Sequence, residues 1–243
     1  MADVVNPLDE VRAFFRAALV QPVERDHTEP DEAIRRRRVV AGVTLVVGAV
    51  ALALALRIEP GNDLFYPATL GVAAIWAVGA FASGRIHPGR AHTRDGTTSL
   101  SVVQSLVLGG GLLLVFLAGA ALVAQVPFLR DPVQELLDHA RFGDLWIVAL
   151  ITAINGIAEE LYFRGALYAA AGRRHPVPIT TAIYGLAVLP TGIPLLVFAA
   201  VVLGTLVGLQ RRVTGGVLGP IVTHLTWSLG MLFLLPAALT LWS

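Results

Sequence analysis

Long apolar stretches separated by short polar segments dominate the chain after residue 38. Most approach the roughly 20 apolar residues that a helix needs to cross a bilayer. The pattern predicts an all-α fold, a polytopic membrane helix bundle with about seven transmembrane helices. We place these helices near residues 39–56, 64–83, 100–126, 145–163, 178–190, 194–210 and 217–235. The fifth stretch is short and ends at Pro190, so we expect it to lie in a protected interior, where broken helices are tolerated.

The first 38 residues are polar and hold eight of the 17 acidic residues. Asn6-Pro7 is typical of a helix N-cap followed by a proline in the first turn. Apolar residues then recur at helical spacing, at Leu8, Val11, Phe14, Phe15, Ala18 and Leu19. This spacing predicts an amphipathic helix that lies either on a membrane surface or on the protein's own loops. Residues 21–34 are charged and contain two prolines, which predicts a mobile linker.

Arginine placement predicts the orientation in the membrane. Arg35, Arg36, Arg37 and Arg38 abut the first apolar stretch, and further arginines lie in the loops at 84–99, 164–177 and 211–216. The opposite side carries Arg57, Arg130 and Arg141, a split of 15 to three. Positive charge collects on the cytoplasmic side. We therefore expect a cytoplasmic N-terminal segment over 1–38 and a membrane domain over 39–243.

The loop at 127–144 lies on the side with few arginines. Asp131-Pro132 is typical of a helix start. The residues Val133, Leu136, Leu137 and Ala140 would share one helical face. The loop therefore predicts a short surface helix.

Composition narrows the classes of function. Hydrophobic residues make up 56% of the 243 residues and charged residues 14%, which argues against a water-soluble enzyme. The absence of cysteine excludes disulfides, thiolate catalysis and cysteine-ligated zinc. A net charge of +1 argues against a nucleic-acid partner. Arginine supplies all 18 basic residues, which favours a bacterial source, so we expect an integral protein of a bacterial cell membrane.

Only two of the 17 acidic residues, Glu159 and Glu160, lie inside a predicted membrane helix. A charge at the bilayer centre costs roughly 2.5–3.5 kcal/mol on insertion scales, so both are functional candidates. Glu160 and Arg164 are four residues apart and can form an ion pair. Glu159 points about 100° away, on the face of Asn155, with no basic partner in its own helix. Such a carboxylate suits general-base catalysis, and the alternative is a hydrogen bond to a neighbouring helix.

His224 is the one histidine of six that lies well inside a predicted membrane helix, and Ser228 shares its face. By helical rise, His224 lies roughly 10 Å and Glu159 roughly 8 Å from the cytoplasmic ends of their helices. The two side chains are therefore expected to meet around one water molecule or one metal ion. The alternative for His224 is a hydrogen bond between helices.

The segment Glu159-Glu160-Leu161-Tyr162-Phe163-Arg164 resembles the Glu-Glu-x-x-x-Arg motif of the CAAX protease and bacteriocin-processing (CPBP) family of intramembrane metalloproteases. The resemblance covers about residues 145–235, the four-helix core of that family. It implies that Glu159 activates a water molecule and that His224 helps to hold the metal or the water. It also implies that Arg164 pairs with Glu160 to keep its helix in register.

Two positions differ from the family pattern. Val188 stands four residues after Tyr184, where the family has a histidine, and Ser228 replaces an asparagine that stabilises an oxyanion in the family. A catalytic zinc usually has three protein ligands and a water. The resemblance implies zinc as a possible cofactor, with Glu159 and His224 as its ligands here. Three cases stay open: Glu159 activates water with little or no metal, a further ligand completes the metal site, or the protein is a pseudo-protease. Ser228 can still donate a hydrogen bond to an oxyanion.

Three functions stay open. The first is an intramembrane metalloendopeptidase, in which a polar cavity open to the cytoplasm admits a peptide or a membrane protein and Glu159 activates water. The second is a non-catalytic pseudo-protease that binds or regulates membrane partners, which Val188 and Ser228 favour. The third is an ion-coupled transporter with Glu159 as its proton site, against which the lack of internal repeats counts. The expected partners are this substrate and the lipid bilayer, with no oligomeric state predicted.

Overall fold

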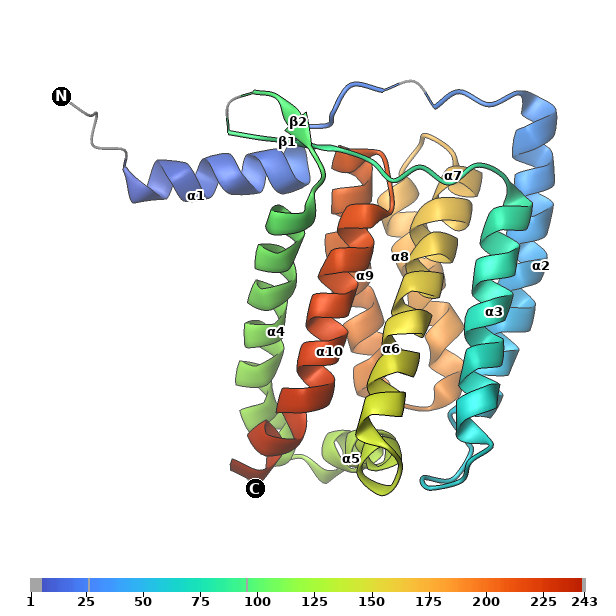
Figure 1. The fold of residues 1–243 in the computed structure, drawn as a ribbon, viewed down its shortest axis with the longest axis vertical. Helices are drawn as coiled ribbons and strands as arrows, with labels where there is room; N and C mark the ends of the chain where they lie inside the picture. Colours follow the sequence, from blue (N-terminus) through green and yellow to red (C-terminus); the bar gives the residue numbers. More distant parts are fainter. Residues whose placement is uncertain (1–5, 26, 95, 242–243) are drawn as a thin grey trace.

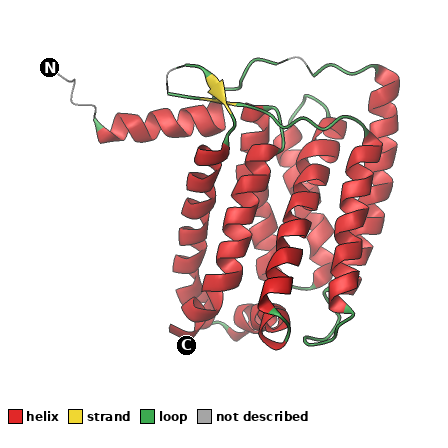
Figure 2. Ribbon diagram, in the orientation of Figure 1, coloured by secondary structure: helices red, strands yellow, loops and turns green. Residues whose placement is uncertain are grey.

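The computed structural model describes residues 6–25, 27–94 and 96–241. Helices make up most of this part of the chain, and the long membrane helices stand side by side in one bundle (Figure 1, Figure 2). The helices are α1 (Pro7–Phe15), α2 (Asp31–Ala55), α3 (Phe65–Ser83), α4 (Val102–Ala124), α5 (Pro127–Phe142), α6 (Leu145–Glu160), α7 (Tyr168–Ala171), α8 (Pro176–Val188), α9 (Pro194–Thr214) and α10 (Leu218–Leu241). The π-helical turns Arg16–Val20 and Leu161–Leu167 follow α1 and α6, and the 3₁₀ turn Leu189–Thr191 follows α8. β1 (Ala91–His92) pairs antiparallel with β2 (Thr98–Ser99).

Six helical segments among the described residues are long and apolar enough to cross a membrane. They are Asp31–Ala55, Phe65–Ser83, Val102–Ala124, Leu145–Ala171, Pro194–Thr214 and Leu218–Leu241. The remaining predicted span is the shorter apolar segment Pro176–Thr191, which contains α8. The all-α polytopic membrane bundle is therefore confirmed, and the protein is an integral membrane protein. The short segment that contains α8 corresponds to the fifth apolar stretch, which the sequence predicts to be short.

The first membrane helix begins earlier than predicted, at Asp31 instead of residue 39. Arg37 consequently lies within α2, where its side chain is buried. Its guanidinium donates to both carboxylate oxygens of Glu29, which neutralises the charge and lets the helix continue through an arginine run. The expected boundary between 1–38 and 39–243 thus falls inside a continuous helix.

The segment before α2 is attached to the bundle, contrary to the predicted mobile linker. The Val23 amide donates to the Val213 carbonyl oxygen at 2.9 Å. The Arg25 guanidinium donates to the carbonyl oxygens of Arg212 and Val213 at the end of α9. Because α9 ends with unpaired carbonyl groups, an arginine there acts as a C-terminal cap, a long-range contact that composition does not predict.

Helix α1 begins as predicted, with the Asn6 side chain accepting a hydrogen bond from the Leu8 amide at 3.1 Å. It projects sideways from one end of the bundle, roughly perpendicular to the membrane helices (Figure 1). Leu8, Val11 and Phe15 are exposed, and only Ala18 in the following turn is buried. This arrangement favours the membrane-surface interpretation over packing on the protein's own loops.

Helix α5 lies across the opposite end of the bundle (Figure 1). It begins at Pro127 instead of Asp131, and Pro132 lies inside it. Pro127 takes the first-turn position, where a missing N–H has no intrahelical partner to lose, so the expected start was placed too late. Val133 is buried, and His139 Nε2 donates to the Ile58 carbonyl oxygen at 2.9 Å. α5 is thereby tied to the loop between α2 and α3.

Close aromatic packing fixes the rotation of α6. Trp76 of α3 is fully buried, and its ring lies 4.6 Å from that of Tyr162. The Tyr162 hydroxyl donates to the Ala41 carbonyl oxygen of α2 at 2.6 Å. A Cβ at Gly48 would overlap the Trp76 ring, so this glycine permits the approach of α2. Within lipid, such packing and interhelical hydrogen bonds hold helices together, because the hydrophobic effect does not.

Candidate functional site

The helix that carries the two adjacent carboxylates does not end near residue 163. It continues through the π-helical turn Leu161–Leu167 and α7 to Ala171. Arg164 is therefore buried inside the helix and does not begin a cytoplasmic loop, which corrects the sequence prediction. Wide π-type turns occur frequently at functional sites, and no sequence pattern used above identifies one.

Glu159 and His224 nevertheless lie at one level. Gly165 packs against Val217, the residue before α10, because a Cβ at Gly165 would lie 3.6 Å from a Val217 methyl group. From this common level, Glu159 is six residues away and His224 seven, or roughly 9 and 10 Å by helical rise. The predicted meeting depth is correct, although it assumed the wrong helix end.

Glu160 binds two partners. Its Oε1 lies 3.1 Å from Arg164 Nη1, which confirms the predicted ion pair, and 2.8 Å from His224 Nδ1. All three side chains are buried. A carboxylate paired with an arginine accepts hydrogen bonds, so Nδ1 is assigned the imidazole proton. His224 therefore contacts Glu160 directly, where the sequence favoured a pairing with Glu159, and its Nε2 is left as the acceptor nitrogen.

Glu159 has a different partner. Its Oε2 accepts a hydrogen bond from the Tyr184 hydroxyl of α8 at 2.5 Å. Arg164 lies over the Tyr184 ring, 4.8 Å from the ring centroid, in a cation–π arrangement. The hydrogen bond to a neighbouring helix, which the sequence left as the alternative for Glu159, is therefore present. At the sequence level, Tyr184 served only to locate Val188, and nothing in the spacing indicated that its hydroxyl reaches the carboxylate.

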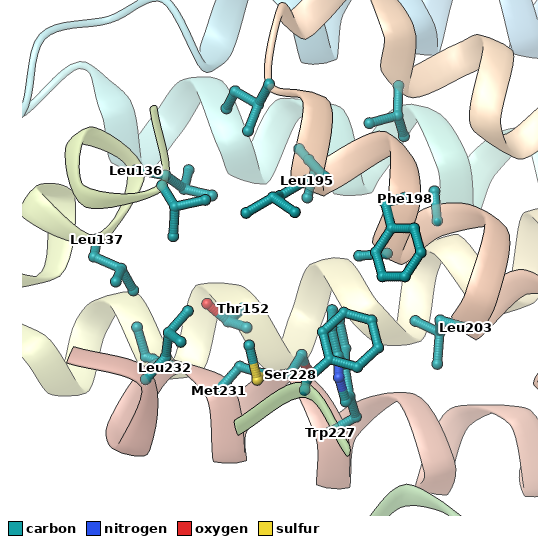
Figure 3. Close-up of a pocket in the computed structure, with 18 of the residues that line it drawn as sticks. Leu136, Leu137, Thr152, Leu195, Phe198, Leu203, Trp227, Ser228, Met231 and Leu232 are labelled. Carbon is teal, nitrogen blue, oxygen red and sulfur yellow. The ribbon is translucent and has the colours of Figure 1, made fainter. Parts of the chain in front are cut away.

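A cavity of about 700 Å³ is bordered by Glu159, Tyr184 and His224. Figure 3 shows part of its wall. Aliphatic and aromatic side chains form most of its wall, including Leu136, Leu195, Phe198 and Leu203. Its polar side chains are Thr69, His139, Thr152, Asn155, Glu159, Tyr184, His224 and Ser228. The cavity thus brings together Glu159, His224 and Ser228, as the sequence predicts, while Glu160 and Arg164 lie behind them.

Ser228 lies one helical turn beyond His224 on α10. Its Oγ is buried and has no hydrogen-bond partner among the residues that the structure describes. An unpartnered hydroxyl that lines the cavity can donate to a ligand without first breaking a bond.

The cavity differs from the expected polar opening toward the cytoplasm. Its wall is mainly apolar, and its lining on α6 runs from Val148 to Glu159, away from the arginine-rich end. On α10 the lining likewise begins at His224 and continues to Leu235. The expectation was wrong because helical periodicity shows which face is polar but not where neighbouring helices separate.

The side chains at the cavity do not match an ordinary zinc site. Within the described part of the chain, no group of three or more His, Cys, Asp or Glu side chains is arranged to hold a metal ion. Glu159 and the Nε2 of His224 supply two donors, and Val188 lines the cavity at the position where the family has a histidine. His175 is exposed, in the turn before α8. Catalytic zinc usually needs three protein ligands.

Comparison with known proteins agrees with the motif. Residues 141–230 match the model of the type II CAAX prenyl endopeptidase Rce1-like family. No curated protein and no solved structure matches the chain. The matched region runs from the end of α5 to the middle of α10 and contains every candidate site residue named above. Residues 141–230, and with them the candidate site, are therefore similar to the CAAX protease-like family of membrane proteins that the motif indicates.

Proposed function

We propose that this protein is a membrane-embedded endopeptidase that uses Glu159 to activate water at the inner end of the apolar cavity. The observation that carries the proposal is that the two adjacent carboxylates have different surroundings. Glu160 is enclosed by Arg164 and His224, whereas Glu159 faces the cavity and is held through one oxygen by Tyr184. A carboxylate with one oxygen held and the other free suits a general base.

The reaction needs only groups that line the cavity. Glu159 takes a proton from water, whose oxygen adds to the peptide carbonyl carbon. The Ser228 hydroxyl donates to the oxyanion that forms. The carbon–nitrogen bond then breaks, and the proton held by Glu159 passes to the leaving amine. His224 Nε2 accepts a hydrogen bond from the attacking water and thereby orients it.

Glu160 and Arg164 act as positioning residues in this scheme. Glu160 accepts from His224 Nδ1, which fixes the tautomer and leaves Nε2 free to accept. Arg164 forms an ion pair with Glu160 and also supports the Tyr184 ring. The substrate is a membrane-associated peptide or protein, and prenylated C-termini and bacteriocin leaders are the classes that the family implies.

Hydrolysis can be tested directly in proteoliposomes. The purified protein is incubated with membrane-anchored peptides in ¹⁸O-labelled water, and the products are analysed by mass spectrometry. The proposal predicts new carboxyl termini that carry ¹⁸O with the wild-type protein and not with the Glu159→Gln variant. The absence of labelled products with both proteins would support the alternative, a non-catalytic binding protein in which Val188 replaces the missing histidine, whereas equal products from both would exclude Glu159 as the base.

Replacing Tyr184 with Phe is expected to lower kcat by about 10- to 100-fold with little change in KM. The variant loses a hydrogen bond to a charged group, which contributes about 1.5–3 kcal/mol. Tyr162→Phe is the matched control, because its hydroxyl bonds to Ala41 on α2 and does not touch the carboxylates. Steady-state kinetics on the two folded variants compare them. Equal losses in both would contradict an orienting role for Tyr184.

Zinc content is expected to be well below one ion per chain in the wild-type protein, because the cavity offers two donors. The Val188→His variant adds the third donor and is expected to gain zinc, which a further His224→Ala change removes. Elemental mass spectrometry of the purified proteins measures this. Near-stoichiometric zinc in the wild type that disappears in His224→Ala would show that an additional ligand completes the site.

A further inference from the structure

A second, smaller cavity lies at the arginine-rich end of the bundle, between the start of α2 and the end of α3. These two helices stand side by side (Figure 1). The volume of the cavity is about 300 Å³, and ligand pockets usually range from about 300 to 1,000 Å³. Its lining includes three arginines and one carboxylate, namely Arg36, Arg37, Arg85 and Glu29. We call this cavity the arginine pocket.

One buried side chain holds the arginine pocket together. Arg37 is 1% exposed and donates through Nε and Nη2 to both carboxylate oxygens of Glu29. Its Nη2 also donates to the Arg85 carbonyl oxygen at 3.2 Å. A Cβ at Gly84, whose φ is +145°, would lie 2.5 Å from Arg37 Nη2, so glycine lets the guanidinium reach the end of α3. Arg37 therefore links the segment before α2 to the loop after α3.

The arginine pocket has more positive than negative charge. Glu29 is the one acidic residue among the described residues that line it, and Arg37 binds both of its carboxylate oxygens. Arg36 donates through Nη2 to the Ala82 carbonyl oxygen at 3.0 Å, which is a neutral partner. The lining therefore holds two arginine charges, those of Arg36 and Arg85, that its single carboxylate does not neutralise.

The surroundings of the pocket have a positive electrostatic potential. His87 follows Arg85 by two residues in the same loop. Burial lowers the pKa of His87, and the charges of three nearby arginines lower it further. These are Arg211, Arg85 and Arg37, and Glu29 acts in the opposite direction. The carboxylate therefore offsets only part of the arginine charge, which favours an anion as the ligand of the pocket.

The position of the pocket indicates the kind of anion. Val39 and Val43 follow Arg36 by three and seven residues and therefore share its helical face. Both are 62% exposed, so an apolar, lipid-facing surface begins one turn away from the pocket. Guanidinium groups bind phosphate oxygens in a forked arrangement. Basic pockets between membrane helices on the cytoplasmic side suit the headgroups of anionic lipids.

We propose that the arginine pocket binds an anionic phosphate group, carried by a lipid of the cytoplasmic leaflet. The positive-inside rule places the arginine-rich end in the cytoplasm. The phosphate lies between Arg36 and Arg85, and the acyl chains lie along α2 past Val39 and Val43. The bound lipid holds the start of α2 against the end of α3. This binding does not depend on the proposed hydrolysis.

Native mass spectrometry of the full-length protein in detergent measures lipid binding directly. The two probes are phosphatidylglycerol, which is anionic, and phosphatidylcholine with the same acyl chains, whose choline group cancels the phosphate charge. We expect the wild-type protein to bind phosphatidylglycerol about tenfold more tightly. The double variant Arg36→Gln, Arg85→Gln is expected to bind this lipid about tenfold more weakly than the wild type, because it loses two charged contacts to the phosphate.

The matched control is the double variant Arg35→Gln, Arg173→Gln. Both residues are exposed arginines that lie outside the pocket lining, and the variant has the same net charge as the test variant. It should bind phosphatidylglycerol like the wild type. Glu159→Gln should also leave lipid binding unchanged, so failure of the proposed hydrolysis and failure of this site are distinguishable.

Glycerol 3-phosphate separates a lipid from a soluble source of the phosphate. We expect it to displace little phosphatidylglycerol at an equal concentration. If it displaces the lipid from the wild type but not from the control protein's remaining general sites in Arg36→Gln, Arg85→Gln, the pocket binds a soluble phosphate ester and the lipid source is wrong. Equal binding of phosphatidylglycerol by the wild type and the pocket variant, or equal losses in the pocket and control variants, would overturn the site.

Discussion

Replacing Glu159 with Gln is expected to reduce peptide hydrolysis by about 100- to 10,000-fold, the usual contribution of a general base. Gln has the same shape as Glu. Its amide oxygen can still accept a hydrogen bond from the Tyr184 hydroxyl, which donates to Glu159 at 2.5 Å in the wild type. The amide cannot take a proton from water. The loss should therefore appear in kcat, measured as initial rates in proteoliposomes, while the unfolding midpoint stays close to that of the wild type.

Glu135→Gln is the matched control for this variant, because Glu135 is exposed on α5 and outside the cavity lining. It carries the same change of charge and should retain the wild-type rate. A Glu159→Gln protein that cleaves normally would exclude Glu159 as the base. If cells that express it also behave like the wild type, while loss of the whole protein has an effect, the binding alternative gains support.

Replacing Arg164 with Met is expected to destabilise the folded protein by about 3–5 kcal/mol. The variant leaves the carboxylate of Glu160 buried with His224 as its remaining partner. It also removes the cation over the Tyr184 ring. Chemical unfolding in detergent, followed by circular dichroism, measures the change.

The double variant Glu160→Gln, Arg164→Met removes both charges and is expected to recover most of that loss, because an uncompensated buried charge no longer remains. Arg12→Met is the surface control. Its ion pair with Asp9 at 3.4 Å is exposed, and such pairs contribute about 0–1 kcal/mol. A single Arg164→Met variant as stable as Arg12→Met would show that the buried ion pair does not hold the site together.

Local patterns in the sequence determine the parts of this protein that depend on near neighbours. The apolar stretches locate the membrane helices, because a spanning helix satisfies its backbone within itself. Asn6 caps α1 through a residue two positions away, and Glu160 reaches Arg164 one turn along the same helix. The adjacent carboxylates are conspicuous because charge inside a membrane helix is costly.

Long-range packing decides the rest of the site. Tyr184 lies 25 residues from Glu159, and His224 lies 64 residues from Glu160. Helical periodicity places each side chain on a face, but the rotation of α6 depends on contacts such as the Trp76–Tyr162 ring pair. The same applies to the direction of the cavity, which depends on where helices separate. The sequence alone therefore identifies the candidate site residues, and only the tertiary structure decides which of them touch and where the cavity beside them lies.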